Sequence, residues 1–108
     1  TLEAAASLSG RRLTEIHVVG GGAQNALLCQ RTADRAGLPV LAGPVEATAI
    51  GNLGVQLMGA GRLANLAALR AMVRASFAVK EYAPAEQKEW QAASRRFAEL
   101  LAAKSARP

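Results

Sequence analysis

Three consecutive glycines, Gly20, Gly21 and Gly22, are followed closely by two amide side chains, Gln24 and Asn25. Glycine can take φ > 0 in a turn, and it has no Cβ to hold a ligand away from the backbone. An amide group both donates and accepts hydrogen bonds. A helix that starts after such a turn presents N–H groups without partners and a partial positive charge, which favour phosphate or another polar ligand group. The segment therefore predicts a nucleotide site.

Two strands and a helix are predicted around this turn. Residues 13–19 are rich in β-branched and apolar side chains, which predicts a strand that is covered on both faces. Residues 26–36 have the apolar period of a helix, and Gly37 is suited to the position just after its end. Residues 38–41 predict a second short strand, with Pro39 at its start or at a sheet edge because proline cannot donate to the ladder.

The middle of the chain predicts two further helices. After a loop at 43–45, residues 46–58 have a helical pattern in which Gly51 and Gly54 lie on one face. Glycine inside a helix costs about 1 kcal/mol relative to alanine, so this face indicates close approach of a ligand or of another backbone. Tight helix packing explains it equally well. Asn65 can cap a helix over residues 66–76, and residues 77–82 have a loosely extended pattern.

The last predicted helix has Pro84 in its first turn and runs to about residue 103. Its apolar side chains share one face, which is typical of amphipathic packing and not of a cofactor site: Trp90, Ala93, Phe97, Leu100 and Leu101. The order strand–helix–strand–helix, followed by further helices, predicts an α/β fold. Two strands leave open sheet edges, which favour a homodimer or a domain-swapped form.

The composition predicts a single small globular unit. At 108 residues, a globule buries about two-thirds of its unfolded surface. Hydrophobic residues make up 51% and charged residues 19%, which excludes wholesale disorder. No apolar run approaches the ~20 residues of a membrane span, and the first residues have no signal-peptide pattern. Because the chain opens on Thr1 and not on methionine, we expect it to be a segment of a longer protein. Cys29 is the single cysteine, which predicts a small core residue and a reducing, cytoplasmic setting.

The charge and the glycine spacing exclude several ligand classes. The net charge is +5, but the adjacent basic pairs are limited to Arg11–Arg12 and Arg95–Arg96, whereas nucleic-acid modules concentrate charge on one face. We therefore expect no nucleic-acid partner. A Rossmann fingerprint needs a third glycine where Asn25 stands and an acidic residue after the next strand, and this sequence has neither. The Gly-Lys-Ser/Thr of a phosphate-binding P-loop does not occur.

Two blocks in order fit a different pattern. Gly-Gly-Gly-Ala-Gln-Asn at 20–25 and Gly-Pro-Val-Glu-Ala-Thr-Ala-Ile-Gly-Asn-Leu-Gly at 43–54 resemble the C-terminal part of the FGGY carbohydrate kinases. The resemblance extends over residues 13–103. It implies a partial actin/hexokinase-like (ribonuclease H-like) domain, with residues 1–108 as a C-terminal fragment of the second, nucleotide-binding domain. Gly51-Asn52-Leu53-Gly54 stands where many members have an alanine pair, and this variant resembles the rhamnulokinase branch.

The resemblance also implies a ligand and a reaction. In the family the first block binds adenosine, so Gly20, Gly21 and Gly22 would let the turn lie against ATP, with Gly21 as the foremost candidate. Asn25 would offer its amide to the adenine or the ribose, with Gln24 as a weaker candidate. The full-length parent would transfer the γ-phosphoryl group to a sugar, L-rhamnulose for this branch, with Mg²⁺ on the phosphates. The alternatives are a xylulokinase- or gluconokinase-type member of the family and a non-catalytic α/β interaction module.

We expect no catalytic and no metal-binding residue in this chain. Family members use an upstream aspartate as general base and bind the sugar through upstream residues, and none of the acidic residues here lies in a matching motif. Asp34 is interpreted as a solvated charge, and Glu46 as a carboxylate at a helix N-terminus. His17 is either a hydrogen-bonded core residue or partly exposed. The fragment alone is therefore expected to be inactive as a kinase.

Overall fold

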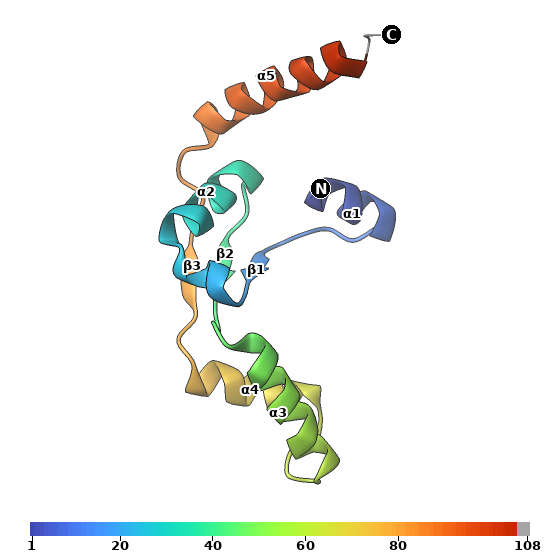
Figure 1. Ribbon diagram of the computed structural model, residues 1–108, viewed down its shortest axis with the longest axis vertical. Helices are drawn as coiled ribbons and strands as arrows, with labels where there is room; N and C mark the ends of the chain where they lie inside the picture. Colours follow the sequence, from blue (N-terminus) through green and yellow to red (C-terminus); the bar gives the residue numbers. More distant parts are fainter. Residues whose placement is uncertain (106–108) are drawn as a thin grey trace.

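The computed structural model describes residues 1–105 and shows five α-helices, three short strands and one 3-10 turn (Figure 1). Their order confirms the predicted α/β fold. The elements are α1 (Leu2–Ser9), β1 (Ile16–Val18), η1 (Gly21–Gln24), α2 (Ala26–Ala36), β2 (Val40–Ala42), α3 (Ala47–Gly59), α4 (Leu66–Ser76), β3 (Lys80–Tyr82) and α5 (Gln87–Ser105). None of these described helices is long and apolar enough to cross a membrane.

The three strands form one sheet in the order β1-β2-β3. β1 and β2 are parallel and pair Ile16 with Val40, and α2 is the crossover that parallel pairing requires. β3 is antiparallel to β2 and pairs Tyr82 with Val40. The extended segment predicted at 77–82 is therefore a third strand over its last three residues. Alternation along three-residue strands is too short a signal to show this pairing in the sequence.

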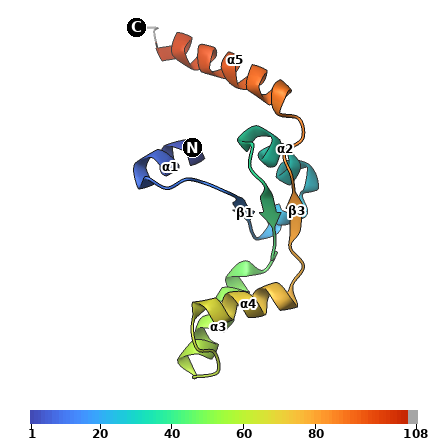
Figure 2. The ribbon, with the colours of Figure 1, turned by 180° about the vertical axis from the view of Figure 1, so that it is seen from behind.

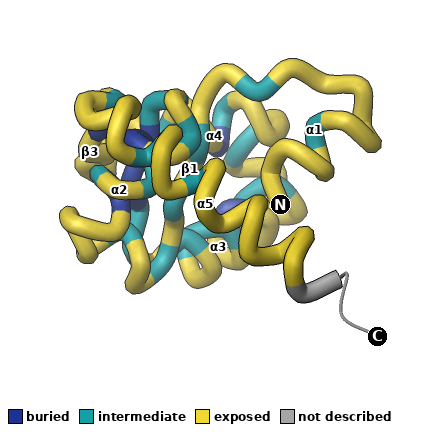
Figure 3. The backbone as a smooth tube through the Cα atoms, turned by 90° about the horizontal axis from the view of Figure 1, so that it is seen from above, coloured by how far each residue is buried: buried dark blue, intermediate teal, exposed yellow. Residues whose placement is uncertain are grey.

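The core lies between α2 and one face of the sheet. Cys29 and Ala33 of α2 are fully buried, as is Val40 of β2, and Ala42 and Tyr82 complete the cluster. The prediction that Cys29 is a small core residue is confirmed. Figure 3 shows the buried residues gathered around α2 and the strands.

The opposite face of the sheet carries no such cluster. His17, Leu41 and Glu81 are in register across the three strands, and His17 and Glu81 are exposed. The prediction that the first strand is covered on both faces was wrong. Among the described helices, α2 is the one that covers the sheet extensively, and the others lie beyond the two ends of the sheet (Figures 1 and 2).

The chain is elongated, with extents of 59 × 29 × 23 Å and a radius of gyration of 18.1 Å. A compact chain of this length has a radius of about 13 Å. The accessible surface is 8263 Å², whereas a globule of this mass exposes about 5,700 Å². The expected core for a 108-residue globule therefore did not form, and roughly 2,600 Å² of extra surface is exposed.

The last helix accounts for part of this exposed surface. α5 contacts α2 near Trp90 and then extends away from the rest of the chain (Figures 1 and 2). Phe97 is 62% exposed and Leu100 is 61% exposed. The predicted amphipathic packing of this face was wrong within the described residues, because no other element lies beside the second half of α5.

Two further helices, α3 and α4, pack against each other beyond the carboxyl end of β2 (Figure 2). A Cβ added at Gly54 would overlap the side chain of Leu69, so tight helix packing explains this glycine. The same position at Gly51 has no atom of the described residues within 4 Å. Asn65 caps α4 as predicted, because its side-chain oxygen accepts a hydrogen bond of 3.0 Å from the Ala68 N–H.

Candidate functional site

The candidate site is the turn that joins β1 to α2. After β1, Gly20 has φ 75° and ψ −163°, a conformation that is accessible essentially to glycine alone. The 3-10 turn η1 follows, and the Ala23 N–H donates a hydrogen bond of 3.0 Å to the Gly20 carbonyl oxygen. The Asn25 N–H donates to the Gly22 carbonyl oxygen at 3.1 Å. The three glycines therefore leave the strand and form a turn before the helix begins.

The structure requires glycine to a different degree at each of the three positions. The positive φ of Gly20 demands glycine whatever space surrounds it. A Cβ at Gly22 would lie 3.7 Å from Cγ1 of Val18, an ordinary contact. A Cβ at Gly21 would have no atom of the described residues within 4 Å. The fold of this chain thus needs Gly20, while the backbone at Gly21 is bare and open to a ligand.

Asn25 lies at the start of α2, and the two polar atoms of its side-chain amide, Oδ1 and Nδ2, have different surroundings. Its Oδ1 accepts a hydrogen bond of 3.0 Å from the Leu28 N–H and so caps the helix. Its Nδ2 group donates to nothing within residues 1–105, and the side chain is exposed. Gln24 is also exposed. The first turn of α2 therefore presents one exposed side-chain donor beside the bare glycine turn.

The second block of the sequence lies beside this turn. The Gly43 N–H donates to the Val18 carbonyl oxygen at 2.8 Å, and the Gly20 N–H donates to the Pro44 carbonyl oxygen at 3.2 Å. Both loops leave the carboxyl ends of the parallel strands β1 and β2, which is where open α/β sheets bind ligands. The role of Pro44 was not predicted. The only sequence signal for it was the position of Gly43-Pro44-Val45 directly after the second strand.

The polar residues of α3 stay on its surface. Thr48 and Asn52 are exposed, and the Asn52 Oδ1 accepts a hydrogen bond of 2.6 Å from Gln56 Nε2. Glu46 lies at the N-terminal cap position of α3 but makes no side-chain capping hydrogen bond. Its place agrees with the predicted carboxylate at a helix N-terminus, where the helix dipole favours negative charge.

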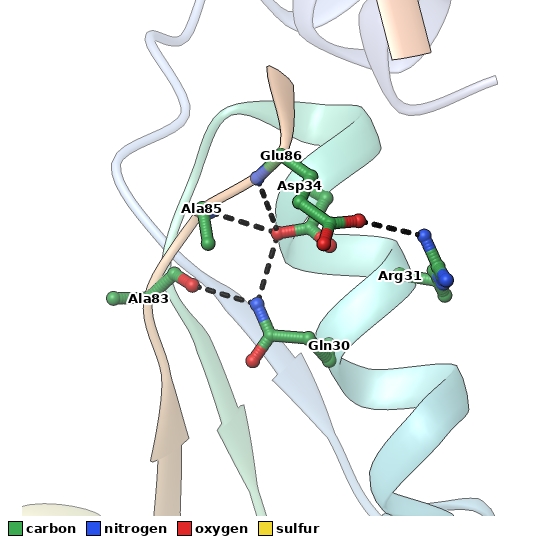
Figure 4. A network of polar contacts seen from close by, with 6 residues as sticks. All are labelled: Gln30, Arg31, Asp34, Ala83, Ala85 and Glu86. Atoms are coloured by element: carbon green, nitrogen blue, oxygen red, sulfur yellow. Dashed lines mark hydrogen bonds and ion pairs between the residues drawn. The ribbon is translucent and has the colours of Figure 1, made fainter. Parts of the chain in front are cut away.

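Asp34 corrects the sequence-based interpretation. Its side chain is not solvated, since the residue is only 3% exposed. Its Oδ1 accepts hydrogen bonds from the Ala85 N–H at 2.8 Å, the Gln30 Nε2 at 2.9 Å and the Glu86 N–H at 3.4 Å (Figure 4). The Ala85 backbone hydrogen bond is the main cause that lowers the pKa of this carboxyl, and Gln30 adds to the effect. Its two backbone partners, Ala85 and Glu86, lie 51 and 52 residues further along the chain, so no local pattern in the sequence predicted them.

Among the titratable groups of the described residues, the buried Cys29 thiol reaches the glycine turn, since its Sγ donates to the Gly22 carbonyl oxygen at 3.7 Å. Asp34 lies nine residues along α2 from Asn25, or about 14 Å of helix. His17 is exposed, and its Nε2 lies 2.9 Å from the Glu15 Oε1. Of the two alternatives for His17, partial exposure is the one observed. Within residues 1–105, no group of three or more His, Cys, Asp or Glu side chains could hold a metal ion.

The glycine turn joins a parallel strand to a helix, and the second glycine-bearing block lies at the same edge of the sheet. Residues 1–60 match the FGGY family of carbohydrate kinases, C-terminal domain, and the chain belongs to this family. The mixed α/β architecture agrees with the C-terminal domain of this actin/hexokinase-like fold. The resemblance predicted from the two blocks is therefore confirmed.

Similar proteins include several bacterial rhamnulokinases. That of Pectobacterium carotovorum subsp. carotovorum (strain PC1) is 47% identical over 88 residues, which are 82% of this chain and 18% of the relative. That of Bacteroides thetaiotaomicron is 45% identical over 92 residues, or 85% and 19%. That of Klebsiella pneumoniae (strain 342) is 47% identical over 79 residues, or 73% and 16%. The chain thus spans less than a fifth of the length of these relatives.

Proposed function

We propose that this chain forms the adenosine end of the ATP site in an FGGY sugar kinase of the rhamnulokinase type. The observation that carries the proposal is the bare backbone at Gly21 beside the exposed Nδ2 donor of Asn25. The turn lies at the carboxyl ends of two parallel strands and next to the second block. The similarity to rhamnulokinases supports the choice of ATP as the ligand.

Each site residue has a role that follows from its chemistry. The glycines Gly20, Gly21 and Gly22 let the flat nucleoside approach the backbone without meeting a side chain. Asn25 donates through Nδ2 to an acceptor on the adenine or the ribose, because its Oδ1 already caps α2. Gln24 offers a second exposed amide next to it.

The reaction of the whole kinase needs groups beyond this site. Transfer of the γ-phosphoryl group requires a base that takes the proton of the sugar hydroxyl, and Mg²⁺ to neutralise charge on the phosphates. Asp34 cannot be that base, since it is buried and its Oδ1 is occupied by three donors. The residues of this chain offer no metal cluster in the described range, so Mg²⁺ would be held by ATP and by other parts of the kinase. We therefore propose that L-rhamnulose is phosphorylated only by a longer protein that includes this segment.

Calorimetric titration of the chain with ATP·Mg²⁺ tests the site. Gly21→Leu adds a side chain where the chain itself leaves room, so its thermal unfolding should match that of the wild type. If the nucleoside rests on this turn, the variant loses at least about tenfold in affinity because the new side chain occupies the ligand position. Equal affinity in the two proteins would remove Gly21 from the site. If neither the wild type nor Gly21→Leu gives a heat of binding, the non-catalytic interaction module is favoured.

The sugar and the assembly need separate assays. A panel of L-rhamnulose, xylulose and gluconate, offered to a full-length kinase that contains this segment, distinguishes the rhamnulokinase type from the two alternative types. We also propose that the outer edges of β1 and β3 pair between two copies of this chain, because each strand has a neighbour on one side only. Light scattering that gives the mass of a monomer at high concentration would contradict this pairing. We place the kinase in the cytoplasm, as the single cysteine and the use of ATP favour.

A further inference from the structure

One polar cluster is built with long-range contacts but has no part in the proposed nucleotide site. Three donors meet at the Oδ1 of Asp34: Gln30 Nε2, the Ala85 N–H and the Glu86 N–H. Gln30 also donates to the Ala83 carbonyl oxygen at 2.8 Å. Figure 4 shows these groups between α2 and the backbone of residues 83–86. The backbone of this short link is thus tied to the side chains of α2.

A second pair of contacts extends the cluster to α5. The Arg31 guanidinium lies 3.0 Å from the Glu86 Oε2, and its Cζ lies 6.0 Å from the centre of the Trp90 ring. The ion pair is about half exposed and is worth less than about 1 kcal/mol. The hydrogen bonds that the Asp34 carboxylate accepts are better sheltered. They are therefore the main contacts that hold the link.

The link decides where α5 points. Residues 83–86 join β3 to α5 and form neither strand nor helix, so no ladder fixes their direction. The prediction that Pro84 lies in the first turn of the last helix was wrong. The N–H groups of Ala85 and Glu86 bind Asp34, and the helix starts only at Gln87. Figures 1 and 2 show the second half of α5 extending away from the other described elements.

The position of α5 also creates an apolar groove. A cavity of about 440 Å³ lies between α1, α2 and Trp90, with Leu2, Leu13 and Leu28 among its lining residues. Trp90 is the lining residue that α5 contributes, so a change in the direction of α5 would remove one wall of this groove.

We propose that Gln30, Arg31 and Asp34 form a latch that fixes the direction of α5. When the latch opens, α5 swings as a unit about residues 83–86 and Trp90 leaves the groove. The sheet and its contact with α2 stay intact, because Cys29, Ala33 and Val40 pack without any contribution from the link. The latch is a conformational device and operates whether or not the glycine turn binds a nucleotide.

Hydrogen exchange with residue resolution tests the latch. Asp34→Ala removes the shared acceptor, so exchange at the Ala85 and Glu86 amides should rise on the order of tenfold, with little change in β1 and β2. Asp34→Asn keeps an oxygen at Oδ1 and should rescue most of the protection. Glu81→Gln removes one negative charge from the exposed face of β3 and serves as the matched control, with exchange like that of the wild type.

A second variant and a second measurement distinguish opening of the latch from misfolding of the chain. Gln30→Met keeps the length of the side chain but removes both of its hydrogen bonds, and it should raise exchange at the same link. Trp90 is the only tryptophan of the chain, so acrylamide should quench its fluorescence more in both latch variants. Unchanged exchange at Ala85 and Glu86 in both variants would overturn the proposal. So would a rise of equal size throughout the sheet, since Asp34 would then support the core and not a latch.

Discussion

A single substitution can separate the helix-capping role of the Asn25 Oδ1 from the proposed donor role of its Nδ2. Asn25→Asp keeps an oxygen that accepts from the Leu28 N–H, at 3.0 Å in the wild type, and aspartate caps helices as well as asparagine does. Its negative charge at the N-terminus of α2 adds about 0.3–1 kcal/mol of stability. The same substitution replaces the Nδ2 donor by an acceptor. Helix capping is thereby kept while donation to a ligand is lost.

The expected free-energy changes rank the three proteins differently for stability and for affinity. Asn25→Ala loses the cap and costs about 1 kcal/mol of stability, or about 4–8 °C in Tm for a chain of this size. In binding it loses one hydrogen bond, about 0.5–1.5 kcal/mol. Asn25→Asp sets an acceptor against the acceptor on the nucleoside and costs about 1–3 kcal/mol, or roughly 5- to 150-fold in Kd. We expect stability in the order Asp, Asn, Ala and affinity in the order Asn, Ala, Asp.

Thermal unfolding and calorimetric titration with ATP·Mg²⁺ measure the two orders on the same three proteins. Titrations at two salt concentrations control for the added charge, because simple repulsion from the phosphates weakens with salt while a lost hydrogen bond does not. If Asn25→Asp binds ATP as tightly as the wild type, Nδ2 does not touch the nucleotide. The proposed role of this residue would then be refuted, although the cap would stand.

Three further predictions concern the fold. Gly20→Ala forces a side chain into positive φ and should cost about 1–2 kcal/mol, seen as a lower denaturant midpoint; an unchanged midpoint would show that the turn relaxes. Gly54→Ala should destabilise the α3–α4 pair by about 1–3 kcal/mol because its Cβ meets Leu69, and Leu69→Ala in the same chain should recover part of that loss; strictly additive losses would exclude the contact. The hydrogen bonds that lower the pKa of Asp34 below its usual 3.8 favour the charged form in the folded chain, so their contribution is present above that pH and is lost as the pH falls through the lower folded value. Circular dichroism melts from pH 6 to pH 2 should show this loss in the wild type and a flatter profile in Asp34→Asn.

The sequence predicted the elements whose signals are local. Gly20 and Gly37 mark the ends of the turn and of α2 through their own backbone preferences, and Asn65 caps α4 through its own side chain. The candidate site is local in the same sense, since its residues are contiguous.

The missed features depend on residues that are distant in the chain. Asp34 has the appearance of a surface charge until residues 83–86 fold over it, 51 positions later. The apolar face of α5 predicted packing, but periodicity shows only that a face is apolar and not that a partner is present. For Phe97 and Leu100 no partner lies within the described residues, and the face remains exposed. β3 was recognised only as extended because its pairing with β2 is set by tertiary contacts.

Main-chain hydrogen bonds join the β1 end of the glycine turn to the loop that follows β2, from Gly43 to Val18 and from Gly20 to Pro44. Contacts between main-chain atoms tolerate exchange of side chains but not a change in loop length, since one inserted residue would shift every donor away from its acceptor. In a chimaeric kinase built from two relatives, these loops should be transplanted together. A crossover placed between them would pair a donor loop with an acceptor loop of foreign geometry.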